Sequence, residues 1–395
     1  MTKAPTLNID RRSLFAAAAA STALAASNGA LANPDGTVYE PRGWVGRHKR
    51  LPILDLESQQ DYLEGFRIWV NSDVNQAAND RIDQIMRARG IDPKADLPLE
   101  QILAQLKDDP IVTLMPAAWL RVQQLMWRTL DDHFHAHQDQ YLTEMEAEDK
   151  RGPGALELNP KMDVPEYTAR EIHMQPGGYV GNMFAGQLYH HGTNGFFNGK
   201  NYQDETHDAR AAAVLTPPDG KVKRVLEFGT GIGQLPMALK RRFPEAEVWA
   251  DDVAGPMLRY AHMRTAQMGV DVRYVQGLSE KSQFPDNHFD MVTNNLLIHE
   301  VPAQQIKDIA AEAYRTLRPG GVFYPLDSYS GDQPRNTALS KYAAWRSYRW
   351  NHEVWWMEYY GLDLAQAMRD VGFKVDENGP KGRGDTTRNV VGYKI

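Results

Sequence analysis

The chain has 395 residues, of which 42% are hydrophobic, and its formal net charge at pH 7 is −7. This length and apolar content suffice for one large or two ordinary globular domains. The acidic balance argues against nucleic acid as a partner, because binding to phosphates needs a basic surface. The chain contains no cysteine, which is compatible with an oxidising compartment but does not require one.

The first residues have the layout of an export signal. Arg11 and Arg12 precede an uncharged, alanine-rich run over residues 16–26, and A-L-A at 30–32 offers a small-x-small cleavage site. This layout resembles a twin-arginine-type signal peptide, and the apolar run is too short for a permanent membrane anchor. We therefore expect residues 1–32 to direct the protein through the twin-arginine export machinery, so that it is periplasmic or secreted. The alternative is a disordered tail on a cytoplasmic protein.

A mainly helical domain is expected at residues 33–165. Residues 97–106 predict one amphipathic helix, and an apolar stripe at three-, four- and seven-residue steps predicts a longer one from Trp119 to Met145. Residues 150–165 are rich in glycine and proline, which indicates a linker or an extended crossing.

Three histidines in this region have metal-like spacing. On a helix, His133 and His137 would share a face as metal ligands do, but His135 would point away. No Glu-x-x-His partner accompanies them. We therefore expect no metal site.

A strand followed by a glycine-rich turn begins at residue 223. Residues 223–228 predict a buried strand, and residues 234–243 predict the helix after it. Between them lie Gly229, Gly231 and Gly233, which allow positive φ angles and leave room for a ligand at the backbone. The dinucleotide fingerprint is G-x-G-x-x-G, so this spacing disfavours a nicotinamide dehydrogenase and favours an adenosyl cofactor.

A second strand is predicted at residues 247–253, and it ends in acidic residues. In two-half α/β nucleotide-binding folds, a carboxylate at this place accepts hydrogen bonds from ribose hydroxyls. Of the two candidates, Asp252 is the better placed.

Four further segments have the order and spacing of a known family: D-V-A-G-P-M-L at 252–258, V-Q-G-L-S-E at 275–280, F-P-D-N-H-F-D at 284–290 and L-R-P-G-G at 317–321. With the glycine-rich turn, they resemble the class I S-adenosylmethionine-dependent methyltransferases, specifically the small-molecule, type 11 group related to quinone biosynthesis. The resemblance covers residues 223–395. It implies an α/β, Rossmann-like, doubly wound sheet of seven strands with an antiparallel last strand, and S-adenosyl-L-methionine as cofactor.

The resemblance also implies a set of cofactor-binding residues: Glu227, Gly229, Thr230, Gly231, Gly233, Asp252, Val253, Gly277, Leu278, Ser279 and Asn294. The family commonly has an acidic residue near position 278 that binds the adenine amino group, and this chain departs from that pattern. Backbone groups around Gly277, Ser279 or Glu280 would then have to bind the base.

His299 is the candidate catalytic residue. It follows the predicted fourth strand, whose carboxyl end opens toward the methyl group in the family's architecture. A histidine there would remove a proton from an attacking hydroxyl or amine, or it would orient the substrate or cofactor. Many methyl transfers need no base, because the sulfonium is already a strong electrophile and proximity supplies much of the acceleration.

Residues 175–192 lie where similar methyltransferases fold over the cofactor, and their glycines predict a mobile lid. Tyr179, Tyr189, His190 and His191 would face the pocket as substrate or lid residues. Alternatively, they are packing aromatics and a surface histidine pair.

Two aromatic segments follow the fifth predicted strand, at residues 342–350 and 355–360. Aromatic side chains at this density would form an apolar acceptor pocket. They would equally well attach the amino-terminal helices to the catalytic domain, and both interpretations remain open here.

The sequence therefore predicts an export signal at 1–32, a helical domain at 33–165, a lid at 166–222 and a methyltransferase domain at 223–395. The expected activity is methyl transfer to a small, apolar or aromatic acceptor. The alternative is an exported, non-catalytic protein that keeps the fold and binds adenosyl compounds or has a structural role.

Overall fold

The computed structural model describes residues 31–32, 38–39, 43–197, 199–327, 337–377, 379 and 389–395. Contacts divide the chain into two units, residues 1–61 and 62–395. In the first unit, two antiparallel pairs are formed: β1 (Leu31–Ala32) with β2 (Val38–Tyr39), and β3 (Trp44–Val45) with β4 (His48–Lys49). The paired arginines and the apolar run of the predicted export signal lie outside the described residues.

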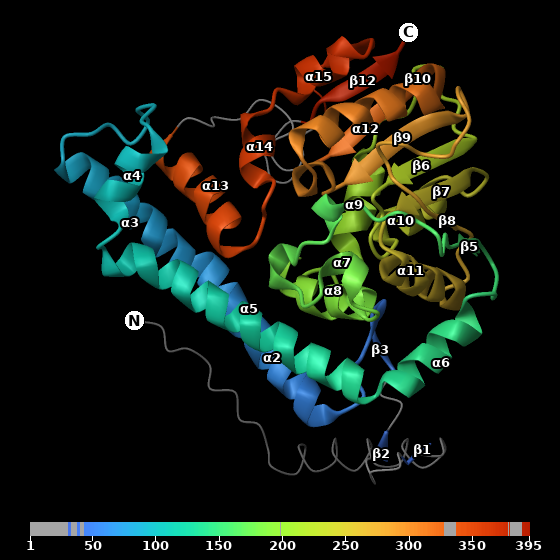
Figure 1. Ribbon diagram of the computed structural model, residues 1–395, viewed down its shortest axis with the longest axis horizontal. Coiled ribbons are helices and arrows are strands. Elements are labelled where there is room, and N and C mark those ends of the chain that lie inside the picture. The colour runs from blue at the N-terminus through green and yellow to red at the C-terminus, as the bar shows by residue number, and fades with distance from the viewer. Residues whose placement is uncertain are drawn as a thin grey trace, which may run out of the picture. The chain divides into compact units, whose positions relative to one another are not determined.

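A helical region opens the second unit. Its elements are α2 (Leu54–Trp69), which begins in the first unit, the π-helical η2 (Val70–Val74), α3 (Asn75–Ala88), α4 (Leu99–Leu106), α5 (Pro110–Ala136) and α6 (Gln138–Glu148). In Figure 1, α3 and α5 lie side by side. Asp109 caps α5 by accepting hydrogen bonds from the backbone amides of Ile111 and Val112.

The prediction of one continuous helix from Trp119 to Met145 is wrong. The backbone leaves helical geometry at His137, with φ −119° and ψ 28°, so two helices replace one. The apolar stripe nevertheless continues across the break, because Met126 and Leu130 on α5 and Tyr141 and Met145 on α6 are all buried.

An eight-stranded sheet forms the centre of the second unit, in the order β11-β12-β10-β9-β6-β7-β8-β5. The strands are β5 (Ala155–Glu157), β6 (Arg224–Phe228), β7 (Glu247–Asp252), β8 (Arg273–Gln276), β9 (Phe289–Asn295), β10 (Leu317–Leu326), β11 (Phe373–Asp376) and β12 (Val391–Lys394). β12 is antiparallel to β10 and β11, and the other pairs are parallel. This topology confirms the predicted α/β fold class.

One strand of the sheet was not predicted. β5 lies in the glycine- and proline-rich segment expected to be a linker, and it pairs in parallel with β8 at the edge of the sheet. Gly154 makes this approach possible, because a Cβ there would lie 2.5 Å from the backbone oxygen of Val272.

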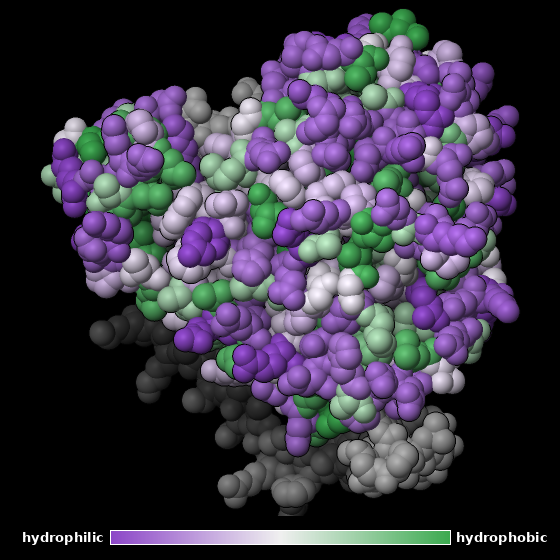
Figure 2. Space-filling view, viewed as in Figure 1, coloured by the Kyte–Doolittle hydropathy of each residue, from purple (hydrophilic) through white to green (hydrophobic). Residues whose placement is uncertain are grey.

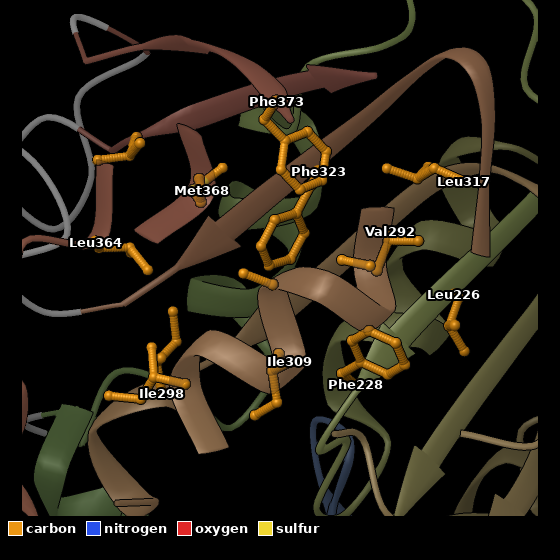
Figure 3. Packing of buried hydrophobic residues seen from close by; sticks show 14 of the residues in the cluster. Leu226, Phe228, Val292, Ile298, Ile309, Leu317, Phe323, Leu364, Met368 and Phe373 are labelled. Atoms are coloured by element: carbon orange, nitrogen blue, oxygen red, sulfur yellow. The ribbon is translucent and has the colours of Figure 1, made fainter. Parts of the chain in front are cut away.

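Helices cover both faces of the sheet, as alternating side chains along β6 require. Leu226 and Phe228 point to the face covered by α12 (Ala303–Thr316), where they belong to one core cluster with Ile309 (Figure 3). Val225 points to the other face, covered by α10 (Gln234–Arg242) and α11 (Gly255–Gln267), and packs in a second cluster with Leu239. Each fully buried aliphatic side chain contributes about 1.5 to 3 kcal/mol.

Short helices connect the helical region to β6: η3 (Glu166–Thr168), η4 (Ile172–Met174), α7 (Gly178–Gly181), α8 (Ala185–Thr193), η5 (Asn194–Phe197) and α9 (Glu205–Ala213). Between β9 and α12 lies η6 (Ile298–Glu300), and α13 (Ala338–Trp350), α14 (Trp356–Gly361) and α15 (Leu364–Asp370) follow β10. Figure 1 shows α13 beside α4, with α14 next along the chain.

The first aromatic segment attaches the helical region. Tyr342 of α13 is buried in a cluster with Ile82, Ile102 and Val112 from α3, α4 and α5. Exposed hydrophobic residues are scattered over the face shown in Figure 2, which is otherwise mostly hydrophilic. Among the described residues, no helix has both the length and the apolar character needed to cross a membrane.

Candidate active site

The glycine-rich turn after β6 has the backbone geometry predicted for it. Gly229, Gly231 and Gly233 have φ angles of +61°, +57° and +74°. A Cβ at Gly233 would lie 2.2 Å from the hydroxyl of Tyr274, so this glycine allows close packing behind the turn. A Cβ at Gly231 would meet only the terminal methyl of Met257, at 3.6 Å, so this glycine leaves open space for a ligand.

Carboxylates at the end of β7 hold this turn in place. The amide of Gly229 donates to Asp251 Oδ1 at 3.1 Å, and the hydroxyl of Ser279 donates to the same oxygen at 2.8 Å. The amide of Gly231 donates to Asp252 Oδ2 at 2.7 Å. Asp251 therefore organises the turn, while Asp252 lines the cavity beside it.

Three carboxyl groups at this end of the cavity have no positively charged ion-pair partner among the described residues to stabilise their ionised forms. Burial raises the pKa of Glu227, of Asp251 and of Asp252. In the described part of the chain, no lysine or arginine forms an ion pair with any of them, and Asp251 Oδ2 has no hydrogen-bond partner. A ligand with cationic groups would remove this cost, which is the chemistry of the ammonium and sulfonium groups of S-adenosylmethionine.

A cavity of about 260 Å³ brings most of the predicted site residues together. Eight predicted cofactor residues line it, as do Tyr179, Tyr189 and His299; the eight are Glu227, Gly229, Thr230, Gly231, Asp252, Val253, Leu278 and Ser279. A ligand held at the glycine turn would therefore lie in the same cavity as His299.

Five predicted residues are absent from this lining: Gly233, Gly277, Asn294, His190 and His191. Asn294 is fully buried, and Asn295 lines the cavity instead, because side chains alternate along β9. His190 contacts the hydroxyl of Tyr260 through Nδ1 at 2.8 Å, and the ring of His191 packs against that of Phe134.

The glycines of α8 have a packing role. A Cβ at Gly186 would lie 2.3 Å from Tyr260, and one at Gly192 would lie 2.0 Å from the ring of Trp127. α8 is thus tightly packed between α5 and α11. The mobile lid expected around these residues stays a prediction.

His299 lies at the end of the cavity away from the glycine turn. Its Nδ1 is 2.6 Å from Asp327 Oδ1, and its Nε2 is 3.5 Å from Glu300 Oε1 and 3.8 Å from Glu353 Oε2. Burial lowers the pKa of His299, but Asp327 and then Glu300 outweigh burial and raise it well above its usual value. Of the two roles that the sequence left open for His299, a raised pKa suits orientation of the substrate or cofactor better than removal of a proton.

Four residues at this end were not predicted from the sequence: His173, Glu300, Asp327 and Glu353. His173 lies between two carboxylates, with Nε2 3.3 Å from Glu300 and Nδ1 3.3 Å from Glu353. Trp356 contacts the ring of His299 edge-on at a centroid distance of 4.9 Å. Asp327 could have been found from the sequence, because it directly follows β10, the strand that pairs with β9. No motif surrounds His173 or Glu353.

The three histidines near residue 135 have separate partners. Nε2 of His133 lies 2.9 Å from the hydroxyl of Tyr141, and burial lowers the pKa of His133 to about 4. His135 pairs with Asp131 at 3.2 Å, while the ring of His137 packs against that of His133.

Part of this domain is similar to known methyltransferases. Residues 225–321 match the family model described as a methyltransferase domain. The chain is 37% identical over 118 residues to a demethylmenaquinone methyltransferase of Thermus thermophilus, covering 30% of this chain and 53% of that protein. It is 33% identical over 119 residues to the ubiquinone/menaquinone biosynthesis C-methyltransferase UbiE of Desulfotalea psychrophila, covering 30% and 47%.

The chain thus spans about half the length of the curated relatives that it matches. A possible histamine N-methyltransferase of Thermotoga maritima has a TM-score of 0.34 at 20% identity, covering 48% of this chain and 88% of that one. A putative methyltransferase of Bacillus halodurans has a TM-score of 0.33 at 24% identity, covering 43% and 70%. These TM-scores are too low to support an argument, and the similarity to methyltransferases rests on the matched segment of residues 225–321.

Proposed function

We propose that the protein is an S-adenosylmethionine-dependent methyltransferase that acts on a small acceptor. The observation that carries this proposal is one cavity that joins the glycine-rich turn and its buried carboxylates to the His299–Asp327 pair. Donor and acceptor sites must adjoin, because methyl transfer needs the attacking atom aligned about 3 Å from the methyl carbon.

The cofactor site is assigned from this chain's own groups. Glu227 and the turn at Gly229 and Gly231 would hold the amino acid part of the cofactor, and Asp252 would accept hydrogen bonds from its ribose. Leu278 and Ser279 line the cavity where the adenine would lie. When bound, the cofactor supplies an electrophilic methyl group on a sulfonium, whose C–S electron pair stays on sulfur after transfer.

His299 is proposed to orient the acceptor. Its ring is fixed by Asp327 and carries a proton, so Nε2 donates a hydrogen bond rather than accepting a proton. A strong base is not required for transfer from a sulfonium, since alignment and exclusion of water supply much of the acceleration.

The acceptor is proposed to be apolar or aromatic. Tyr179, Tyr189, Phe196 and Trp356 line the cavity around His299, and flat apolar walls of this kind suit a ring-shaped molecule. The names of the curated relatives, which describe methyl transfer in quinone biosynthesis, are compatible with such an acceptor.

We also propose that the protein is exported through the twin-arginine machinery, on the basis of Arg11, Arg12 and the apolar run after them. Since this route carries folded proteins, a cofactor bound in the cytoplasm would travel with the chain.

Methyl transfer is tested with the purified full-length chain, S-adenosylmethionine labelled in the methyl group, and a small-molecule extract of the native host. Label in an extracted product supports the enzyme. Cofactor binding without label transfer would favour the non-catalytic binding protein.

A further inference from the structure

Three metal-binding side chains converge at the acceptor end of the cavity. His173, Glu300 and Glu353 each place one donor atom within 4.8 Å of the others. They come from η4, from η6 and from the turn before α14, so three separate segments meet at one point. Donor atoms bound at about 2.1 Å to one metal ion lie roughly 3 to 4 Å apart, which this group matches with small adjustments.

We propose that His173, Glu300 and Glu353 form a binding site for a divalent metal ion. Each carboxylate has one oxygen engaged with His173, and each has its second oxygen, Oε2, buried without a hydrogen-bond partner. Glu353 is only 4% exposed. Buried, unpaired carboxylate oxygens are costly, and a cation between the two groups would pair with both.

The charges around this point favour a cation. Glu300 and Glu353 line this end of the cavity, and Asp327 lies behind the ring of His299, so three carboxylates stand against the two imidazoles of His173 and His299. No lysine or arginine is among the described residues that line the cavity. A divalent ion would supply the missing positive charge without a long side chain.

A protonated His173 clamped between the two carboxylates is the competing interpretation. Asn351 opposes that clamp, because its Nδ2 lies 3.0 Å from Glu353 Oε1 and 2.9 Å from His173 Nδ1. An amide nitrogen donates, so Nδ1 accepts here and carries no proton of its own. The clamp uses Oε1 of each glutamate and leaves both Oε2 atoms without a hydrogen-bond partner, with Oε2 of Glu353 3.8 Å from His299 Nε2. A metal ion would use these remaining oxygens, and it contradicts the expectation from sequence that the chain has no metal site.

The donor set indicates the class of metal. One imidazole nitrogen and two carboxylates suit Mn²⁺, Fe²⁺ or Zn²⁺, whereas thiolate-preferring ions such as Cu(I) would find no soft ligand here. His299, whose Nε2 is 3.5 Å from Glu300, lies close enough to contact whatever fills the remaining coordination positions.

The metal site also restricts the acceptor, an extension that rests on the proposed function. A hydroxyl group bound to the ion would lose its proton to solvent more readily, because the ion lowers the pKa of a coordinated oxygen. The resulting oxygen anion forms a bond to the methyl carbon as the C–S bond breaks and its electron pair remains on sulfur. The acceptor class is therefore a ring compound with a hydroxyl group that can bind the ion.

Metal binding is tested by titrating the full-length chain, purified without a histidine tag and treated with a chelator, with Mn²⁺. The electron paramagnetic resonance signal of free Mn²⁺ reports binding, and Zn²⁺ is added as a competitor. We expect one Mn²⁺ per chain, with at least tenfold weaker binding in Glu300→Gln and in Glu353→Gln. Glu148→Gln is the matched control, because Glu148 is a buried carboxylate at 9% exposure that pairs with Arg151 outside the cavity.

Thermal melting and binding of S-adenosylhomocysteine check that the variants fold. If Glu353→Gln is unfolded, Glu300→Gln decides the question alone, because its side chain is less buried, at 13% exposed against 5% for Glu353. Absence of Mn²⁺ and Zn²⁺ binding to the wild-type chain at millimolar concentration would overturn the site, as would unchanged affinity in a folded variant. Since this titration uses neither cofactor nor acceptor, its failure is distinct from failure of the proposed methyl transfer.

Discussion

Asp327 Oδ1 lies 2.6 Å from His299 Nδ1, and the two residues follow the neighbouring parallel strands β10 and β9. The other oxygen of Asp327 accepts a hydrogen bond from the backbone amide of Ile298 at 2.8 Å. One carboxylate therefore fixes both the ring of His299 and the η6 turn that carries it. Side chains from adjacent strands meet here because the carboxyl ends of parallel strands open on the same edge of the sheet.

The Asp327→Asn variant tests this relationship. Loss of the charged hydrogen bond should lower kcat about ten- to a hundredfold, which corresponds to about 1.5 to 3 kcal/mol for a hydrogen bond to a charged group. The affinity for S-adenosylhomocysteine should not change, because Asp327 is not among the residues that line the cavity. Steady-state kinetics and calorimetry separate the two effects, with Asp219→Asn, an exposed carboxylate paired with Arg318, as the control.

The glycine turn gives a prediction with a matched control. Gly231 and Gly269 both have positive φ angles, +57° and +68°, and neither would meet a close neighbour as alanine. Each alanine variant should lose about 1 to 2 kcal/mol of unfolding free energy, because left-handed geometry is strained for a residue with a Cβ. Only Gly231→Ala should also weaken S-adenosylhomocysteine binding, and equal binding by both variants would remove Gly231 from the cofactor site.

His133 predicts a pH dependence of stability. Its pKa is about 4 in the folded chain because of burial, and the ordinary value in an unfolded chain is about 6.5. The unfolded state therefore binds the proton first, so that stability is complete above about pH 6.5 and falls as the pH drops toward 4, by about 1 to 3 kcal/mol. His133→Gln should flatten this part of the profile in urea unfolding experiments, and a profile identical to wild type would contradict the assignment.

Export gives a prediction outside the described part of the chain. Replacing both Arg11 and Arg12 by lysine should retain the protein in the cytoplasm of the native host, because the paired arginines are the recognition element of twin-arginine signals. Cell fractionation and immunoblotting measure the outcome, with Lys3→Arg as the control. Periplasmic accumulation of the double variant would argue against this route.

The sheet and the cofactor end of the cavity could be predicted from the sequence because their signals are local. The turn at Gly229 and Gly231, the acidic end of β7 and the L-x-P-G-G segment before β10 each combine a backbone requirement with a fixed place along the chain. Asp252 was predicted in this way, since it ends an apolar strand.

Part of the acceptor end could not be predicted, because His173 and Glu353 meet the predicted His299 only in three dimensions. His173 lies in a single 3-10 turn with a left-handed backbone, and Glu353 lies in a loop between two aromatic helices. Neither position has a periodic pattern or a spacing to a partner. β5 was missed for a similar reason, since a three-residue edge strand in a glycine-rich segment is set by the neighbouring strand β8 and not by its own propensity.

The most direct test of the central claim is calorimetric titration of the full-length chain and its Asp252→Ala variant with S-adenosylhomocysteine. We predict a single micromolar site in the wild-type chain, weakened in the variant by about 1 to 3 kcal/mol through loss of hydrogen bonds to a polar ligand. Asp271→Ala, which removes an exposed carboxylate, should bind like wild type. Absence of binding in the wild-type chain, or equal affinity in a folded Asp252→Ala variant, would contradict the assignment of this cavity as a methyl-donor site.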